Sequence, residues 1–474
     1  MMIPTAEQQA VLDAVAKQRR GALKIHAGPG TGKTAVLRMI GDRLHKQGRN
    51  RILYLAYNRA LANEAKEKFE GLADVMTIHA LANRALRVKR SGRRIVSKLD
   101  DRDAARILGV QAQGGSRRIA AATQTLKAFL QSADTAPSEA HVPKTYREGE
   151  DTASIVADAR DLFAALRADS GERRLPITHD IYLKTWHLTG APGLDRYDTV
   201  LLDEAQDANP MVVQALAHAP HAVYVGDEHQ QIYAFIGAVD ALARIEGPTL
   251  VLSQSFRFGP AIAEAANRLL ALKSKPGTFR LRGTPSIDSR IERVDVKQEH
   301  TRLYWTNAAM IEDLVFLADV GRAPMLAAGG EELARVLASA WALHEGQHRR
   351  VRHPFVRLFA NWDDFAEAGA RRGGEAAHAV QIIDLFEQRV PEVIERLQSD
   401  PAHVEVKAWL TTAHKAKGRE WPQVLISDDF DDLIDNDDGK APSDHDINLA
   451  YVAITRAMHR LELQSDALAE IVDS

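Results

Sequence analysis

The chain has 474 residues, 45% of them hydrophobic, which is enough for two to four domains with cores of their own. Its 61 basic and 64 acidic residues give a formal net charge of -3, so net charge does not indicate a nucleic-acid partner. It contains no cysteine, which excludes disulfides, cysteine-based zinc fingers and cysteine nucleophiles.

The N-terminal residues lack the basic segment and apolar run of a signal peptide. No stretch approaches about 18 uninterrupted apolar residues, the length needed to cross a bilayer. We therefore expect a soluble, cytoplasmic protein in which any polyanion site comes from local clustering of charge.

Residues 5–12 are expected to form a capped helix, because Thr5 followed by Gln8 has the spacing of a capping box. Gln8 has this structural interpretation and a functional one, adenine recognition. The functional interpretation depends on the segments that follow.

A glycine-rich turn, HAGPGTGKT at residues 26–34, lies between an expected strand at 22–25 and an expected helix at 35–40. This order is typical of a phosphate-binding loop, in which backbone N–H groups and a helix N-terminus surround a polyphosphate. Lys33 would reach the β- and γ-phosphates, and Thr34 would hold Mg²⁺. Ala27 stands where the pattern usually begins with glycine, and the alternative is a chance GKT in a glycine-rich loop. We expect the nucleotide-binding residues of this segment to be Gly28, Gly30, Thr31, Gly32, Lys33 and Thr34.

Residues 51–56 are expected to form a buried strand, followed by an amphipathic helix through Phe69 and a turn at 76–79. Alternating strands, turns and helices predict an open parallel sheet with ligands at the carboxyl ends of its strands. Residues 84–98 hold seven basic residues and no acidic one. This run fits a solvated face and a phosphate-binding surface equally well.

The strand expected at 199–202 leads directly into Asp203 and Glu204. Two carboxylates at a strand end suit the second half of an ATPase site, where one binds Mg²⁺ and the next orients or deprotonates the attacking water. The alternative is an acidic surface turn, which the phosphate loop in the same sheet disfavours. Strands at 222–225 and 250–252 place further polar groups where a γ-phosphate sensor and an arginine finger would stand.

A second α/β unit is expected to begin after residue 250, with a strand at 303–305 and a helix-rich interval at 309–403. It resumes at 404–407 and continues to a strand at 424–426. Residues 428–446 contain nine aspartates and one lysine, which we interpret as a mobile solvated loop; a metal site there lacks calcium-loop spacing. Residues 448–457 are predicted to form the closing strand.

These segments, in this order, resemble the motifs of UvrD/Rep helicases of superfamily 1 across almost the whole chain. The segments that carry the resemblance are HAGPGTGKT, LLDEAQD, VGDEHQQIYAF, LSQSFRFG, TTAHKAKGREW and YVAITRA. Within that group the chain is most similar to the helicase portion of F-box DNA helicases, notably at residues 178–184. No F-box segment precedes the first motif, so we expect no ubiquitin-ligase role.

The resemblance implies an α/β fold with two RecA-like P-loop domains, parallel sheets and helical insertions. ATP would lie between the two domains and single-stranded DNA across both. The implied parts are domain 1A at 1–80 and 181–250, a helical insertion 1B at 81–180, domain 2A at 251–308 and 404–474, and a reduced 2B-like insertion at 309–403.

The resemblance also assigns residue roles. For ATP it implies that Gln8 and Phe256 contact adenine, that Glu420 lies near the ribose, and that Lys33 and Thr34 bind the phosphates and Mg²⁺. It implies that Asp203 helps to hold the metal and that Glu204 is the base that activates water. It also implies that Gln230 senses the γ-phosphate and that Arg257 and Arg456 are arginine fingers. For single-stranded DNA it implies Tyr57, Asn58, His79, Phe235 and His414, with rings stacking on bases.

Three positions depart from the family pattern, because Ile236, Trp305 and Ala35 stand where arginines are usual.

Our first hypothesis is a 3′ to 5′ single-stranded DNA translocase that unwinds or strips DNA. The alternative is an ATP-switched subunit of a repair or phage-defence complex that docks a partner such as a nuclease and unwinds weakly alone. A helicase and nuclease in one chain is disfavoured, since only eighteen residues follow Arg456.

Overall fold

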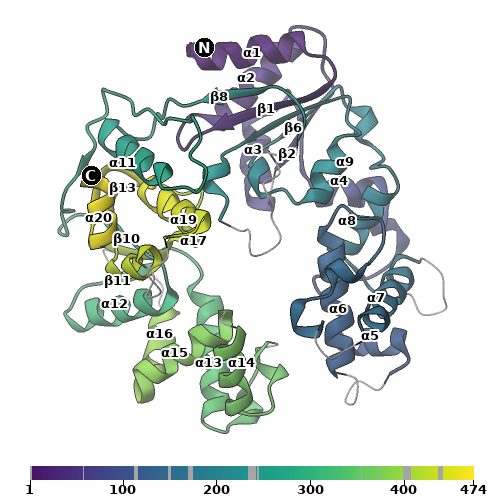
Figure 1. Cartoon of the computed structure of the whole chain (residues 1–474), viewed down its shortest axis with the longest axis vertical. Helices are drawn as coiled ribbons and strands as arrows, with labels where there is room; N and C mark the ends of the chain where they lie inside the picture. The colour runs from purple at the N-terminus through teal and green to yellow at the C-terminus, as the bar shows by residue number, and fades with distance from the viewer. Residues whose placement is uncertain are drawn as a thin grey trace. The chain divides into compact units, whose positions relative to one another are not determined.

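The computed structural model describes residues 3–56, 58–110, 116–147, 151–168, 175–232, 242, 245–353, 355–372, 374–398, 407–435 and 441–473. The chain divides into two compact units, Met1–Ser253 and Gln254–Ser474. Each unit contains a six-stranded parallel sheet with helices (Figure 1). The predicted α/β class with parallel sheets and helical insertions is confirmed.

The sheet of the first unit has the strand order β3-β2-β6-β7-β1-β8. Because β7 lies between β1 and β6, the segments that follow these three strands meet at one edge. The strands are β1 (Gly21–Ala27), β2 (Ile52–Ala56), β3 (Asp74–Thr77), β6 (Thr199–Leu202), β7 (His221–Gly226) and β8 (Thr249–Leu252).

The strands expected at 22–25, 51–56, 199–202, 222–225 and 250–252 are confirmed. The turn expected at 76–79 is wrong, because these residues form the end of β3 and the start of α4 (Ile78–Ala85). A four-residue strand that is only partly buried at the sheet edge carries little periodic signal.

The first sheet is buried on both faces, which explains its continuous apolar strands. Along β2, Leu53 and Leu55 join one core, whereas Ile52 and Tyr54 join the core on the other face. The core that contains Ile52 and Tyr54 is completed by α1 (Ala6–Lys17), α2 (Lys33–His45) and α3 (Arg59–Lys68).

Most of the helices that follow α4 share the core of the opposite face, and the helical region also has a smaller core cluster of its own. Phe129 and Trp186 belong to the same cluster as Leu53 of the sheet. A short parallel pair, β4 (Ile95–Val96) and β5 (Ile177–Thr178), joins the two ends of the region. The helices are α5 (Asp101–Leu108), α6 (Ser116–Gln131), α7 (Thr152–Arg167), α8 (His179–Leu188) and α9 (Pro210–Leu216).

The sheet of the second unit has the order β11-β12-β10-β13-β14-β9. Its strands are β9 (Arg290–Ile291), β10 (His300–Tyr304), β11 (Pro324–Leu326), β12 (Ala408–Thr412), β13 (Trp421–Ile426) and β14 (Ala457–Leu463). Its helices are α11 (Pro260–Ala271), α12 (Asn307–Asp319), α13 (Gly330–His344), α14 (Trp362–Arg372), α15 (Gly374–Phe386), α16 (Val390–Leu397), α17 (Ala413–Ala416), α18 (Asp431–Ile434), α19 (Asp444–Ile454) and α20 (Asp466–Asp473).

Helices α13 to α16 lie between β11 and β12 in the chain, inside the helix-rich interval expected at 309–403. The strand β11 also falls in that interval, although it belongs to the second sheet. Residues 404–406, where the unit is expected to resume, lie outside the described residues.

Two expectations near the C-terminus are wrong. Residues 444–454 form helix α19 and not a strand; Ser443 caps it, and its last eight residues are buried, so the apolar run has no strand period. The aspartate-rich segment is not simply a solvated loop. Asp429 accepts hydrogen bonds from the backbone of Trp305 and Thr306, and Asp444 accepts them from Ser274.

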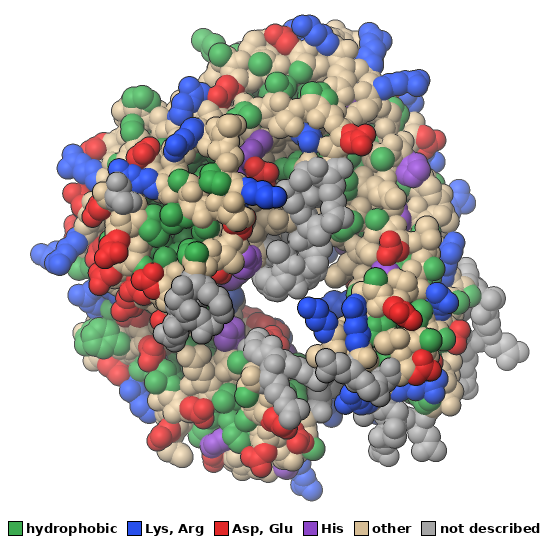
Figure 2. Space-filling model, viewed as in Figure 1, with side chains coloured by type: hydrophobic (Ala, Val, Ile, Leu, Met, Phe, Trp, Pro, Cys, Tyr) green, Lys and Arg blue, Asp and Glu red, His purple; other side chains and the backbone are tan. Residues whose placement is uncertain are grey.

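Among the described residues, no helix combines the length and the apolar character needed to cross a membrane. On the face drawn in Figure 2, basic and acidic side chains are interspersed, in keeping with the near-zero net charge.

Helix α8 carries a buried lysine. The Lys184 side chain is fully buried, its Nζ donates to the Ser132 carbonyl at 2.7 Å, and it lies 4.2 Å from the centre of the Phe129 ring. Burial lowers the pKa of Lys184 to about 8, and the charge of Asp134 only partly opposes this. The folded protein therefore holds this proton less tightly than the unfolded chain.

A native pKa below the unfolded value destabilises the fold at pH values below about 8, and this cost disappears as the pH rises towards the unfolded pKa. Relative to Lys184→Met, the free energy of unfolding of the parent chain should rise by on the order of 2 kcal/mol between pH 8 and pH 10. Denaturant titrations at several pH values measure this, with the exposed Lys127→Met as control. Parallel pH profiles for the parent and Lys184→Met would contradict the assignment.

Candidate nucleotide site and basic hollow

The loop between β1 and α2 is shaped to surround an anion. Gly30 and Gly32 have φ of 71° and 80°, a left-handed conformation that favours glycine. The Thr31 hydroxyl is buried and donates to the Gly28 carbonyl at 2.8 Å, and the Gly28 N–H donates to Leu252 of β8 at 3.1 Å. The loop is thus held in a turn that leads into the N-terminus of α2, which fits a polyphosphate.

Gln8 has a confirmed structural role and a position suited to a second one. Its Oε1 accepts from the Thr5 N–H at 3.0 Å, and its own N–H donates to the Thr5 hydroxyl, which completes the capping box. A Cβ placed on Gly32 would lie 3.6 Å from the Gln8 Nε2. The amide therefore packs against the phosphate loop, and adenine recognition stays a prediction.

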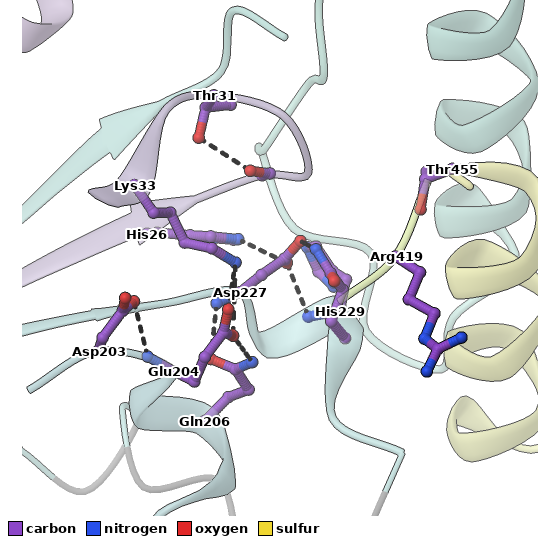
Figure 3. A network of polar contacts seen from close by, with 12 residues as sticks. His26, Thr31, Lys33, Asp203, Glu204, Gln206, Asp227, His229, Arg419 and Thr455 are labelled. Carbon is purple, nitrogen blue, oxygen red and sulfur yellow. Dashed lines mark hydrogen bonds and ion pairs between the residues drawn. The ribbon is translucent and has the colours of Figure 1, made fainter. Parts of the chain in front are cut away.

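Lys33, at the start of α2, forms an ion pair with Glu204, whose Oε1 lies 3.4 Å from the lysine Nζ. Glu204 follows β6 and has a left-handed backbone, with φ of 51°, which is uncommon for a residue with a side chain. Gln206 donates from Nε2 to Glu204 Oε2 at 2.6 Å. The predicted phosphate lysine and the predicted base are therefore held together (Figure 3).

Asp203 is the deeper of the two carboxylates. It accepts from the Tyr54 hydroxyl at 2.6 Å and from the Glu204 N–H at 2.9 Å. Burial, and then the negative charge of Glu204, raise the pKa of Asp203, while Tyr54 and Lys33 partly offset the shift. A divalent cation at this carboxylate would favour its ionised form. The Asp203 carboxylate and the hydroxyl of Thr34, which follows Lys33 in the first turn of α2, are oxygen ligands of the kind that Mg²⁺ prefers.

The segment after β7 joins this arrangement through Gln206. Gln206 Oε1 accepts from the Asp227 N–H at 3.0 Å, and Gln230 Nε2 donates to Asp227 Oδ2 at 2.7 Å. A Cβ on Gly226 would lie 2.4 Å from Gln206 Oε1, so glycine is needed for Gln206 to approach. We call Lys33, Glu204, Gln206, Asp227 and Gln230 the carboxylate network.

Asp227 is fully buried in the carboxylate network. Burial opposes its ionisation, but the hydrogen bond from His26 and the positive charges of His229 and Lys33 hold its pKa well below the usual range. Asp227 therefore carries a negative charge at neutral pH, which fixes Gln230 as a donor towards it.

In the second unit, Arg257 and Glu420 are brought together. Arg257 donates from Nε to Glu420 Oε2 at 2.5 Å and from Nη1 to the Thr455 carbonyl at 2.9 Å. The Phe256 side chain beside it is 48% exposed, which leaves a ring surface available for stacking. The adenine, ribose and finger roles stay predictions.

Arg456 is only 1% exposed. Its guanidinium donates to the carbonyls of Val452 and Arg419 and to the Thr455 hydroxyl, all within the second unit. A finger role for Arg456 stays a prediction and would require the guanidinium to share or leave these acceptors.

The predicted DNA residues have different surroundings. Tyr57 and Phe235, together with Ile236, lie outside the described residues. Asn58 caps α3, accepting from the Leu61 N–H at 2.9 Å. In the second unit, burial, with the charges of His445 and His378, lowers the pKa of His414 to about 4, so its ring is neutral at physiological pH.

The remaining predicted DNA residue, His79, lines a hollow of about 710 Å³ in the first unit. Its ring lies 5.9 Å from that of His179 and 6.2 Å from that of Tyr182, both of which also line the hollow. No acidic residue is among the described lining residues. We call this the basic hollow; its cationic lining residues are Arg59, Arg84, Arg87, Lys89, Arg90 and Arg196.

Sequence reasoning missed three residues of the nucleotide site, and one of them, Asp227, directly follows the expected strand at 222–225 and Gly226. Gln206 lies inside the acidic segment after β6, so its polar side chain three residues beyond Asp203 was a visible signal. Tyr54 gave none, because its contact with Asp203 depends on β2 pairing with β6.

Residues 6–242 match the family model of the UvrD/REP helicase N-terminal domain. The chain is 30% identical over 513 residues to F-box DNA helicase 1 of Gallus gallus, covering 99% of this chain and 49% of the chicken protein. It is 28% identical over 510 residues to F-box DNA helicase protein 1 of Schizosaccharomyces pombe, covering 97% and 57%. ATP-dependent DNA helicase UvrD2 of Mycobacterium tuberculosis is 25% identical over 292 residues, covering 53% and 41%. The chain thus spans about half the length of these F-box relatives.

Gly226→Ala tests the carboxylate network. The new methyl group would displace Gln206, whose backbone nitrogen would also lie only 3.0 Å from the added Cβ, and so separate Glu204 from Asp227. We expect at least a tenfold loss of ATP turnover. The control is Gly41→Ala in α2, where a Cβ meets only Leu72 at 3.7 Å and should stabilise the helix by up to about 1 kcal/mol. Normal turnover by a folded Gly226→Ala protein would contradict this role of Gln206.

Proposed function

Because the chain belongs to the UvrD/REP helicase family, we propose that it is an ATP-dependent DNA helicase that moves 3′ to 5′ along single-stranded DNA. Its substrates are single-stranded DNA and tailed duplexes, and its cofactor is Mg²⁺. The work done is DNA unwinding or protein stripping in repair, recombination or phage defence, in the cytoplasm.

The carboxylate network is the observation that supports this function best. Lys33 is paired with Glu204 at 3.4 Å, and a polyphosphate offers the ammonium far more negative charge than one carboxylate does. Nucleotide binding would therefore draw Lys33 from Glu204 and leave that carboxylate, still held by Gln206, to orient or deprotonate water. This exchange links nucleotide occupancy to the state of the base.

The rest of the carboxylate network connects Glu204 to the segment after β7, so nucleotide binding at Lys33 can also affect that segment. Gln206 bonds both Glu204 and the Asp227 backbone, and Asp227 holds Gln230. A shift of Glu204 would thus be transmitted to the predicted γ-phosphate sensor through three hydrogen bonds. Thr34 and Asp203 would hold the Mg²⁺ that neutralises phosphate charge.

The basic hollow supports a nucleic-acid substrate. Six basic side chains around one hollow form a positive potential suited to a phosphate backbone, in spite of the net charge of -3. The rings of His79 and His179 offer stacking surfaces, each worth about 1 to 3 kcal/mol with any base, whereas the Tyr182 ring is buried. Backbone contact combined with stacking suits binding without sequence preference.

The direct test is ATP turnover of the purified chain with single-stranded DNA, RNA, duplex DNA or no nucleic acid, together with strand displacement on 3′- and 5′-tailed duplexes. We expect stimulation by single-stranded DNA and displacement of the 3′-tailed substrate. Lys33→Ala should abolish turnover, because it removes the cation that binds the phosphates. ATP turnover independent of nucleic acid, with no DNA retention in any nucleotide state, would refute the proposal.

The basic hollow has its own test in Lys89→Gln combined with Arg90→Gln, both exposed positions of its lining. Loss of two phosphate contacts should weaken single-stranded DNA binding at least tenfold and reduce the slope of log affinity against log salt by about 1.4. Fluorescence anisotropy at several salt concentrations measures both quantities. The matched control is Arg19→Gln with Arg20→Gln, exposed arginines outside the hollow. Equal losses in the two double variants would mean that the hollow has no special role.

A further inference from the structure

Three potential metal ligands meet beside the phosphate loop. His26 is the penultimate residue of β1, and Glu228 and His229 form the turn directly after Asp227. Because β1 and β7 pair in parallel with His26 opposite Gly226, the turn is delivered to the end of β1. One ligand atom from each of the three residues lies within 4.8 Å of the other two.

The spacing between these atoms is that of ligands around one small cation. His26 Nδ1 lies 3.6 Å from Glu228 Oε1, and His229 Nε2 lies 3.8 Å from the same oxygen. Both distances exceed a hydrogen bond. Tetrahedral coordination with bonds of about 2.0 to 2.1 Å places ligand atoms roughly 3.3 to 3.4 Å apart. Small side-chain rotations would therefore complete the site.

The surroundings of His26 match a second feature of metal sites, in which a ligating imidazole is oriented by a carboxylate at its other nitrogen. His26 Nε2 lies 3.5 Å from Asp227 Oδ1, and Figure 3 shows His26, Asp227 and His229 converging. Asp227 is itself fixed, because it accepts from the His229 N–H at 3.0 Å and from Gln230 at 2.7 Å. The Nδ1 atom of His26 thereby faces Glu228.

We propose that His26, Glu228 and His229 bind a divalent transition-metal ion of the Zn²⁺ class, with Asp227 orienting His26. Two imidazoles and one carboxylate suit Zn²⁺ or Co²⁺ better than Mg²⁺, which prefers an all-oxygen shell. The ion would join the end of β1 to the turn that carries Gln230. It is a site distinct from Thr34 and Asp203, and its occupancy would restrain the predicted γ-phosphate sensor.

The test uses the full chain without an affinity tag, stripped with chelator and kept in excess Mg²⁺ so that hard oxygen sites are filled. Titration with Co²⁺ should give one equivalent of tight binding with the intense visible absorption of tetrahedral Co²⁺, and Zn²⁺ should displace it. His26→Leu and His229→Asn should each weaken Co²⁺ binding at least 100-fold, and Asp227→Asn 10- to 100-fold. His218→Asn, an exposed histidine of the same unit, is the control and should bind normally.

Thermal unfolding separates loss of the site from loss of the fold. Relative to each metal-free protein, Zn²⁺ should raise the melting temperature of the parent and of His218→Asn but leave that of His26→Leu and His229→Asn unchanged. Absence of tetrahedral Co²⁺ absorption in the parent chain would overturn the proposal. So would an absorption of equal affinity in His26→Leu and His229→Asn, because the ion would then lie elsewhere.

Discussion

The close approach of Gln206 to Gly226 is the constraint on which the nucleotide site depends. Strand β7 lies between the strands that deliver the phosphate loop and the acidic segment, so any side chain at its last residue would separate them. Glycine at 226 lets the Gln206 amide cross this strand end and bond both Glu204 and the Asp227 backbone. Three loops that are distant in sequence thereby become one hydrogen-bonded unit.

Asp203 and Glu204 are consecutive residues, so two carboxylates lie side by side, and different groups reduce the repulsion at each of them. Asp203 is stabilised by the Tyr54 hydroxyl and remains a weak acid because it is buried next to Glu204. Glu204 is neutralised by Lys33. A magnesium nucleotide would bring a cation to the first carboxylate while its phosphates compete for the lysine of the second. The repulsion between the two carboxylates would therefore decrease when a magnesium nucleotide binds. This favours binding of the metal and the phosphates together.

The phosphate loop, the acidic segment and the parallel sheet could be predicted from sequence, because each depends on residues adjacent in the chain. Tyr54 and the cluster of His26, Glu228 and His229 could not, since they depend on strand order. Helix α19 was mistaken for a strand because a run buried on all sides shows no period, although Ser443 with Asp446 was a legible capping signal. Strand β3 was missed because it is only four residues long.

The basic run at 84–98 shows why charge patterns need a fold to be interpreted. Arg93 is 9% exposed and donates to the carbonyls of Leu166, Leu175 and Pro176, so it serves the packing of the helical region. These hydrogen bonds fix the backbone at Arg93. Lys89 and Arg90, which precede it in the chain, line the basic hollow. Arg93 thus fits neither a solvated face nor a phosphate-binding surface, and phosphate binding by its neighbours stays a prediction. A surface able to bind a flexible polyanion needs cations whose positions are fixed beforehand, and burying one arginine of the run fixes its neighbours without using their charges.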